Sequence, residues 1–412
     1  LAVASISAAS PRADRSAPDG AIQALDARLA GDDKRTRLVV DLTGEIPLDA
    51  FVLDEPDRVV IDLPRVDFKM DGQLGQQGRG LIARWRFGLL SPQRSRIVID
   101  AAGPVAIDKA FVLPAVEGQP ARLVLDLIPT TRAAFRAEAL KPRAEPTALT
   151  LPPADAGAAL KKADRRAAPT PVLPATPTKT RPVIVIDAGH GGIDPGTWSR
   201  FSNMVEKEVT LDVAKLLRDK LAKSGRYEIV MTRSEDVFVP LADRVRIARE
   251  ASADLLISVH ADAENVSSVR GATVYTLSDD ASDQRAAELA DKENRADAIA
   301  GLVTSPTTDA VGDILIDLAR RETDRFSHDF ASGLVSRLTG AGKAIRSNPH
   351  RSAGFRVLKA HDVPSILLEL GFLSNREDEA RLRSPEWRNA MTDVLSQSID
   401  AYFAPRVAKE SR

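Results

Sequence analysis

Four residues in the second half of the chain have the types and positions of a hydrolytic metal site: His190, Glu206, His260 and Glu369. His190 lies in the run Asp187-Ala-Gly-His-Gly-Gly192, whose glycines let the backbone turn tightly and admit a substrate. Neutral imidazole and carboxylate groups bind Zn²⁺, and a catalytic zinc typically has three protein ligands and one open position. The two histidines and Glu206 satisfy that count.

Glu369 is the candidate for proton transfer. It ends the apolar run Ile366-Leu-Leu-Glu369, where partial desolvation is expected to raise its pKa. Such a carboxylate can accept a proton from an attacking water and later protonate a leaving amine. Ordinary structural explanations also exist: a histidine at a strand end can be a satisfied core residue, and a helix N-terminus favours a glutamate such as Glu206.

Strand and helix patterns alternate from Pro182 onward. The expected strands are 183–186, 227–232, 255–260, 272–277, 355–358 and 365–369. The expected helices cover 207–223, 241–250, roughly 282–338 and 377–403. This order predicts an α/β catalytic domain over residues 182–405 with a mainly parallel sheet flanked by helices. The carboxyl ends of its strands share one edge, so we expect His190, His260 and Glu369 to converge there, with Glu206 facing them.

A short pattern of arginine, three apolar residues and aspartate occurs four times nearer the N-terminus. The copies are Arg37–Asp41, Arg58–Asp62, Arg96–Asp100 and Arg122–Asp126. Each copy has the composition of a strand, and the copies form two halves that indicate an internal duplication. We therefore expect an all-β sandwich over residues 33–130.

The remaining segments and the composition set limits on function. Residues 1–32 read as a signal remnant and N-terminal extension, and the Pro/Ala-rich residues 131–181 as a disordered linker. No apolar run has the length of a membrane helix. The net charge of -1 gives no reason to expect a nucleic-acid partner, and without cysteine a metal site must use histidine and carboxylate ligands. We expect a monomer.

The segments from Arg181 to Phe403 resemble the zinc-dependent N-acetylmuramoyl-L-alanine amidases of the amidase-3 family. The matching stretches are Val185–Gly196, Glu206-Lys207, Thr232–Leu241 leading to Arg244, Ser258–Asp262 and Val363–Asn375. The resemblance implies that His190, Glu206 and His260 bind zinc and that Glu369 is the catalytic glutamate. The reaction would cleave the amide between the lactyl group of N-acetylmuramic acid and L-alanine in peptidoglycan, for cell separation during division.

Two details accompany this resemblance. The stretch between His190 and Glu206 is one residue longer than is usual in the family, which leaves Glu208 as the alternative ligand. Arg233 and Arg244 look like scaffold residues that pair with acids.

The duplicated region resembles the AMIN domain, a β-sandwich that precedes such amidases, and this implies peptidoglycan binding and a periplasmic location at the division septum. A generic β-sandwich adaptor is the alternative.

A regulatory helical segment is expected at about residues 282–325, inserted in the catalytic domain. With Gln284–Val303 as one helix, Glu293 is the only charged residue on an apolar stripe, while Lys292 and Asn294 lie away from it. A buried carboxylate needs a partner, and a zinc with an open position is a suitable one. Division-associated family members have an occluding helix with a glutamate here. We therefore expect Glu293 to make an inhibitory metal contact that a LytM-type activator protein releases.

Other interpretations use the same residues. The chain could be a zinc peptidase that acts within the stem peptide, or a non-catalytic peptidoglycan-binding protein that retains the fold. Three further histidines, His328, His350 and His361, lie outside the matched motifs. We expect them to be structural or exposed, with His350 the strongest candidate among them for substrate contact.

Overall fold

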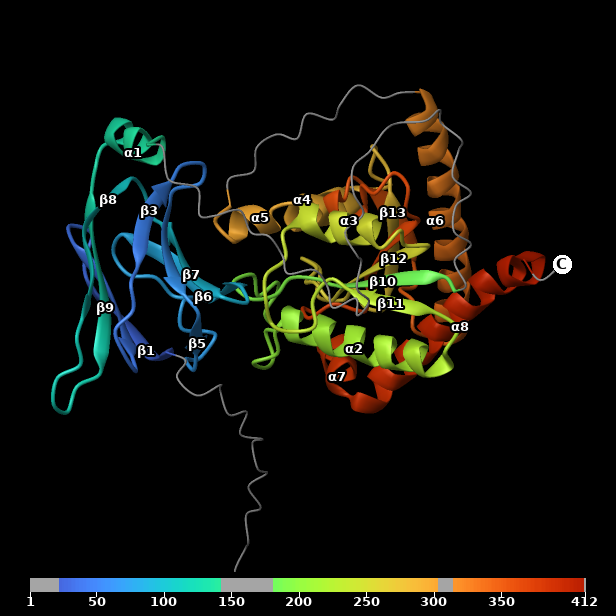
Figure 1. Ribbon diagram of the computed structural model, residues 1–412, viewed down its shortest axis with the longest axis horizontal. Helices are drawn as coiled ribbons and strands as arrows, with labels where there is room; N and C mark the ends of the chain where they lie inside the picture. The colour runs from blue at the N-terminus through green and yellow to red at the C-terminus, as the bar shows by residue number, and fades with distance from the viewer. Residues whose placement is uncertain (1–21, 142–180, 303–313, 411–412) are drawn as a thin grey trace, which may run out of the picture.

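The computed structural model describes residues 22–141, 181–302 and 314–410. An N-terminal β-sandwich and a C-terminal α/β domain lie side by side (Figure 1). No helix in these described ranges is long and apolar enough to cross a membrane.

The sandwich is made of two sheets. The first has the order β5-β1-β2-β9-β8 and the second β3-β4-β7-β6. Their strands are β1 (Ile22–Gly31), β2 (Thr36–Leu42), β3 (Asp49–Leu53), β4 (Arg58–Pro64), β5 (Val66–Phe68), β6 (Ile82–Ser91), β7 (Arg94–Ala101), β8 (Val105–Leu113) and β9 (Ala121–Pro129). β2 pairs with β9 and β4 with β7, both antiparallel, so each sheet contains one copy of the arginine–aspartate pattern from each half of the duplication.

The α/β domain has one sheet of order β11-β10-β12-β15-β13-β14. Its strands are β10 (Val183–Ala188), β11 (Glu228–Met231), β12 (Leu255–His260), β13 (Thr273–Leu277), β14 (His350–Ala353) and β15 (Ser365–Glu369). Neighbouring strands are parallel except β13 and β15, which are antiparallel. The predicted fold class, a mainly parallel α/β domain preceded by an all-β sandwich, is confirmed.

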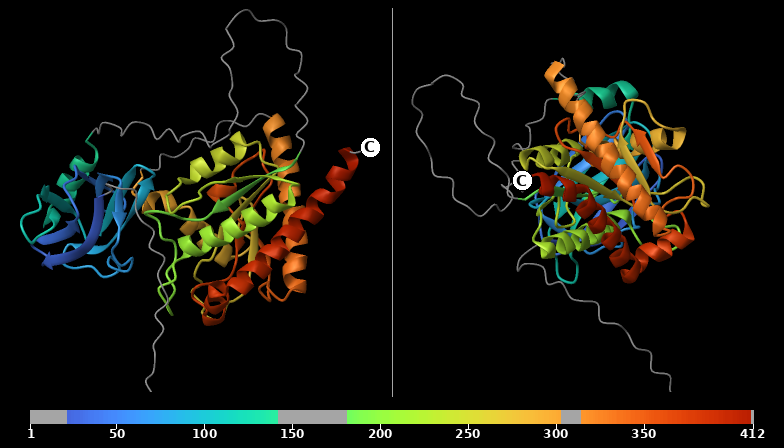
Figure 2. Two further views of the ribbon diagram at one scale, coloured as in Figure 1. Left: turned by 60° about the horizontal axis from the view of Figure 1, so that its bottom comes forward. Right: turned by 90° about the vertical axis from the view of Figure 1, so that its right-hand side faces the viewer.

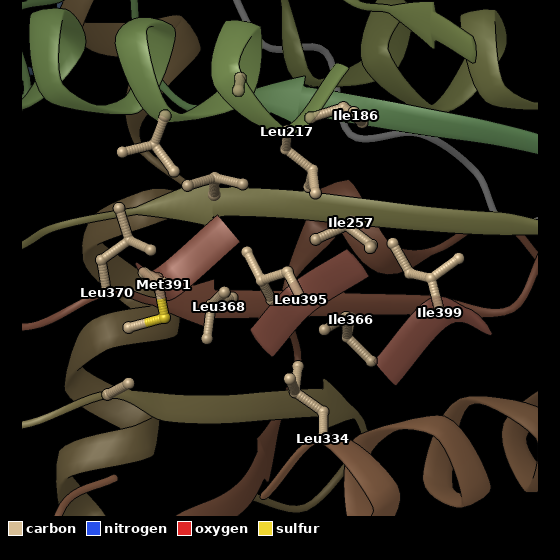
Figure 3. Close-up of a cluster of buried hydrophobic side chains, with 14 of the residues drawn as sticks. Ile186, Leu217, Ile257, Leu334, Ile366, Leu368, Leu370, Met391, Leu395 and Ile399 are labelled. Carbon is tan, nitrogen blue, oxygen red and sulfur yellow. The ribbon is translucent and has the colours of Figure 1, made fainter. Parts of the chain in front are cut away.

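Helices cover both faces of this sheet. On one face, α2 (Glu206–Ser224), α6 (Ile314–Gly340) and α8 (Pro385–Glu410) pack on alternate strand residues such as Ile186 and Ile366 (Figure 3). The neighbouring Val185 points to the opposite face, where α3 (Leu241–Glu250) packs. Continuous apolar strands are explained by this coverage on both faces. The shorter α7 (Arg376–Arg383) precedes α8.

Several expected boundaries differ from the structure. β1 lies within residues 1–32, which we expected to be an extension, and α1 (Arg132–Ala139) lies in the expected linker. Phe135 of α1 is buried in the sandwich core, so apolar packing stabilises this helix. The expected strand at 355–358 is wrong: β14 precedes it, and Arg356–Leu358 form a short 3-10 helix, η1. The expected signal remnant up to residue 21 and linker residues 142–180 lie outside the described residues.

The regulatory segment is not one continuous helix. It consists of α4 (Gln284–Glu293) and α5 (Ala296–Ile299), and Val303 lies outside the described residues. At the break, the Asn294 side chain binds the loop that leads into η1. Its Oδ1 accepts from Arg356 N at 2.7 Å, and its Nδ2 donates to Gly354 O at 2.9 Å. Below, "regulatory segment" means residues 284–302.

Candidate metal centre

His190, Glu206 and His260 come together at the carboxyl edge of the sheet. One ligand atom from each lies within 4.8 Å of the others, and all three side chains are buried. His190 Nε2 is 3.1 Å from Glu206 Oε1, and His260 Nδ1 is 3.3 Å from the same oxygen. Ligand atoms arranged tetrahedrally around zinc at about 2.0–2.1 Å are about 3.3 Å apart. The donor types and the spacing therefore fit a zinc ion.

The loop that carries His190 has an unusual backbone held by two arginines. His190 has a φ of 60°, a left-handed conformation that a residue with a side chain rarely adopts. Arg244 donates to His190 O at 2.8 Å, and Arg233 donates to Gly189 O at 2.9 Å. A Cβ on Gly189 would lie 2.5 Å from the His260 ring, so only glycine permits this approach. The arginines thus fix the loop by binding its carbonyl groups.

These arginines differ in their acidic contacts. Arg244 also pairs with the buried Asp187 at 2.7 Å, as expected for a scaffold residue. Arg233 makes its hydrogen bonds to backbone carbonyls and the Thr210 hydroxyl, rather than to an acid. Asp194 binds the ring nitrogen of His190 that faces away from the cluster, with its Oδ2 at 2.8 Å from His190 Nδ1. This contact orients the imidazole so that Nε2 faces the cluster, as acids behind metal-binding histidines commonly do.

Glu206 occupies the cluster, and the alternative ligand Glu208 does not. The chain before Glu206 forms a loop closed by the bridge between Trp198 and Val205. Glu206 then begins α2, where its Oε2 accepts from Thr197 N and its Oε1 from Ala261 N, both at 2.9 Å. Glu208 lies on the exposed side of the same turn.

Glu369 lies beside the three clustered residues. β12 and β15 are paired so that His260 is opposite Glu369. Glu369 Oε2 accepts from Asp262 N at 2.9 Å, while Oε1 is buried without a hydrogen-bond partner. Burial, together with the nearby Glu206 and Asp262, raises the pKa of Glu369 well above its ordinary value. The residue therefore has one fixed oxygen and one oxygen available for a proton.

Glu293 of α4 completes the cluster from the regulatory segment. Its Oε2 lies 3.5 Å from His190 Nε2 and 3.3 Å from His260 Nδ1, and its side chain is 5% exposed. Its other oxygen and His190 Nε2 are buried without hydrogen-bond partners. The unpartnered His190 Nε2 faces Glu206 Oε1 and Glu293 Oε2. An orphaned buried nitrogen is costly, so this arrangement fits a bound cation.

The electrostatics of the cluster favour a cation. Burial opposes protonation of His190, but Glu206, Asp194 and Glu293 raise the pKa of His190 well above its ordinary value. For Glu206, burial acts to raise the pKa, yet the two histidines lower it well below its ordinary value. The carboxylates therefore create a negative potential that a divalent metal would neutralise.

A second contact between the regulatory segment and the site involves Lys292. Its ammonium contacts Asp262 Oδ1 and lies 2.7 Å from Thr197 Oγ1. Burial disfavours the ammonium, but Asp262 raises the pKa of Lys292 above its ordinary value. The predicted stripe is confirmed, because the buried residues of α4 are Ala286, Leu289, Ala290 and Glu293. Lys292 lies off the stripe with 43% of its side chain exposed, and it still reaches Asp262 because α4 ends next to the site. The remaining histidines lie elsewhere; His350, for example, is in β14 with its ring 5.0 Å from that of His328.

Comparisons with known proteins identify the family. The family model described as N-acetylmuramoyl-L-alanine amidase, amidase-3, matches residues 184–401, and the AMIN domain model matches residues 26–130. The N-acetylmuramoyl-L-alanine amidase AmiC of Escherichia coli O6:H1 is 32% identical over 379 residues, which cover 90% of this chain and 87% of that protein. This chain belongs to the amidase-3 family.

A second curated relative and a solved structure are also similar to this chain. AmiC of Neisseria meningitidis serogroup B is 32% identical over 391 residues, covering 93% of this chain and 90% of that protein. The crystal structure of an N-acetylmuramoyl-L-alanine amidase from Clostridium difficile 630 aligns with 55% of this chain and 98% of that chain, with 25% identity and a TM-score of 0.39. The sequence matches make this chain a peptidoglycan amidase with an AMIN domain. They support neither a stem-peptide peptidase nor a non-catalytic binding protein.

Proposed function

We propose that this amidase uses a zinc ion held by His190, Glu206 and His260 to cleave the amide between the lactyl group of N-acetylmuramic acid and L-alanine. The observation that supports it most is the buried group of three ligand atoms beside the unpartnered Oε1 of Glu369. When bound, zinc would activate a water molecule and polarise the scissile carbonyl. The chain's own residues carry the rest of the chemistry.

Glu369 moves the proton in this scheme. Its Oε1 accepts a proton as the water oxygen forms a bond to the carbonyl carbon. As the carbon–nitrogen bond breaks, the same oxygen gives the proton to the nitrogen of L-alanine, which leaves as an amine. The bond from Asp262 N to Oε2 keeps the carboxylate oriented, and the raised pKa favours the protonated form that the second step needs.

We further propose that Glu293 keeps the enzyme inactive until an activator binds. The position of its Oε2 near both histidines is where a fourth ligand or the substrate carbonyl would bind. Moving α4 away from the site breaks the contacts of Glu293 and Lys292. An activator must therefore offset this loss by binding the open form. A LytM-type protein is the proposed activator.

The AMIN domain would bind peptidoglycan and place the enzyme in the periplasm at the division septum, where cells separate.

The proposed metal site predicts the zinc content of purified protein. We expect about one zinc per chain in the wild type, and an affinity at least about a hundredfold lower after His260→Ala, since one of three protein ligands is lost. Elemental analysis after dialysis against a zinc buffer series would measure both. Glu208→Ala is the matched control and is expected to keep wild-type zinc. Equal zinc affinity in His260→Ala and wild type would contradict the site.

The second contact predicts a gain of activity. Lys292→Met removes the cation that pairs with buried Asp262 and therefore weakens the docking of α4. The Lys292 side chain is 43% exposed, so solvent weakens this ion pair. We expect its loss to cost about 1.4 kcal/mol of docking energy and to raise stem-peptide release from sacculi without activator by about tenfold. Arg295→Met is the matched control, since that side chain is exposed on the same segment. If Lys292→Met and Arg295→Met released peptide equally, Lys292 would have no role in inhibition.

A further inference from the structure

Three arginines of the sandwich bind the regulatory segment. We call Arg58, Arg86 and Arg96 the arginine surface; they lie on β4, β6 and β7 of the second sheet. Figures 1 and 2 show α5 between the two domains, next to this sheet. The bonds run from Arg58 to Ala298 O, from Arg86 to Ile299 O at 2.8 Å, and from Arg96 to Ala300 O and Gly301 O at 3.0 Å each. Carbonyl groups at a helix C-terminus carry partial negative charge, so guanidinium groups stabilise them.

The repeated arginine–aspartate pattern builds this surface. Antiparallel pairing of β4 and β7 places Asp62 opposite Arg96 and Arg58 opposite Asp100. Asp62 accepts two bonds from Arg96 at 2.6 and 2.9 Å, and Asp100 accepts two from Arg86 at 2.9 and 3.2 Å. These acids orient the guanidinium groups and leave N–H groups directed at α5.

Burial distinguishes the arginine surface from an ordinary charged sheet face. Arg58 and Arg96 are each only 4% exposed. Arg58 has no ion pair within the described ranges, and burial lowers its pKa. Its N–H groups bind the carbonyls of Pro56 and Ala298 instead. With α5 in place, Ala298 O is an acceptor that compensates for the burial of this guanidinium.

Apolar residues extend the same interface. Val60 and Val98 lie between the arginines and pack with Ala300 of the regulatory segment, all at 0% exposure. A Cβ at Gly301 would lie 3.2 Å from Val60 Cγ2. The sandwich also binds the loop that follows His190, because Leu89 O accepts from Ile193 N at 3.1 Å. The interface therefore joins the sandwich to both the regulatory segment and the metal-site loop.

We propose that the β-sandwich is part of the inhibitory device: the arginine surface holds α5, and thereby keeps α4 and Glu293 over the metal site. Only Asn294 and Arg295 separate α4 from α5, so α4 cannot move far while α5 stays bound. Opening of the site then requires the sandwich and α5 to separate. This inference rests on the proposed inhibitory role of Glu293.

Hydrogen exchange of the full chain tests it without relying on catalysis. Arg58→Met removes the bond to Ala298 O but no ion pair of the sandwich. Since hydrogen bonds to charged groups contribute more than neutral ones, we expect amide exchange in α4 and α5 to become about tenfold faster or more. Arg37→Met is the matched control, because Arg37 lies in the equivalent pattern of the other sheet and pairs there with Asp126 at 2.6 Å. It is expected to leave the exchange of α4 unchanged.

Two outcomes would overturn the inference: unchanged exchange in both helices, or faster exchange in α5 alone. Retained protection of β1 and β8, which carry none of the substituted residues, verifies that the sandwich of each variant is folded. Ala300→Trp is the second variant; it disturbs the interface from the regulatory side and is expected to speed α4 exchange as well. If Glu293→Ala failed to increase activity while Arg58→Met sped α4 exchange, the inhibitory role of Glu293 would be wrong. The coupling of α4 to the sandwich through α5 would remain.

Discussion

Replacing Glu369 with glutamine is expected to lower kcat for stem-peptide release by about 10²–10⁴-fold. Glutamine keeps the shape of the side chain and can still accept the bond from Asp262 N, but it cannot take a proton from the attacking water. The measurement is peptide release from purified sacculi in the Glu293→Ala background, where activity without activator is expected to be measurable.

Zinc content separates this effect from loss of the metal. Glu369 is not among the three clustered ligand residues, so Glu369→Gln is expected to bind about as much zinc as its parent protein. Activity within a few-fold of the parent, with zinc bound, would show that another group transfers the proton. A loss of zinc together with activity would show that Glu369 serves the metal instead.

Glu293→Ala is expected to raise activity without activator by about tenfold or more. The substitution removes the only carboxylate that the regulatory segment places against His190 and His260. It therefore frees the position that the substrate carbonyl needs, even if α4 stays partly docked through Lys292. A shift of the closed–open equilibrium by about 1.4 kcal/mol already gives a tenfold change.

The control for this variant lies on the same helix. Glu288 is exposed on α4, and its Oε1 accepts a bond from Gln284 at 2.8 Å, away from the metal site. Glu288→Ala is expected to release peptide at the wild-type rate. If Glu293→Ala also stayed at the wild-type rate while it bound zinc, Glu293 would not be an inhibitory group.

The parts of the site at strand ends were predictable from the sequence. His260 and Glu369 each follow an uninterrupted apolar run, and parallel pairing of β12 and β15 places them opposite each other. Which of Glu206 and Glu208 reaches the cluster depends on the loop before α2, which the sequence pattern does not determine. The bridge from Trp198 to Val205, which returns the chain to the site, has no periodic pattern in the sequence.

The contacts between segments were not predictable in the same way. Helical periodicity placed Glu293 on a buried stripe, but it could not show that Lys292 reaches Asp262 across the site. The 3-10 helix η1 replaced an expected strand where Asn294 satisfies the backbone N–H of Arg356. β1 was missed because small alanines, Ala24 and Ala27, supply its buried positions in place of β-branched residues.

The contacts of the sandwich arginines were also not predictable from the sequence. The arginine–aspartate pattern predicted the duplication and four of the strands, β2, β4, β7 and β9, which pair between the halves within the two sheets. Nothing in the pattern distinguishes Arg96, which binds carbonyls of the regulatory segment, from Arg37, which pairs with Asp126 within the other sheet. That difference arises only when the domains are placed side by side.

The most direct test of the account is end-group analysis of sacculi digested by zinc-loaded Glu293→Ala protein and by wild type, both without activator. The account predicts new α-amino groups of L-alanine and intact lactyl groups on the glycan, formed at least about tenfold faster by the variant. New ends within the stem peptide would contradict the assigned reaction. Equal rates for the two zinc-loaded proteins would contradict inhibition by Glu293.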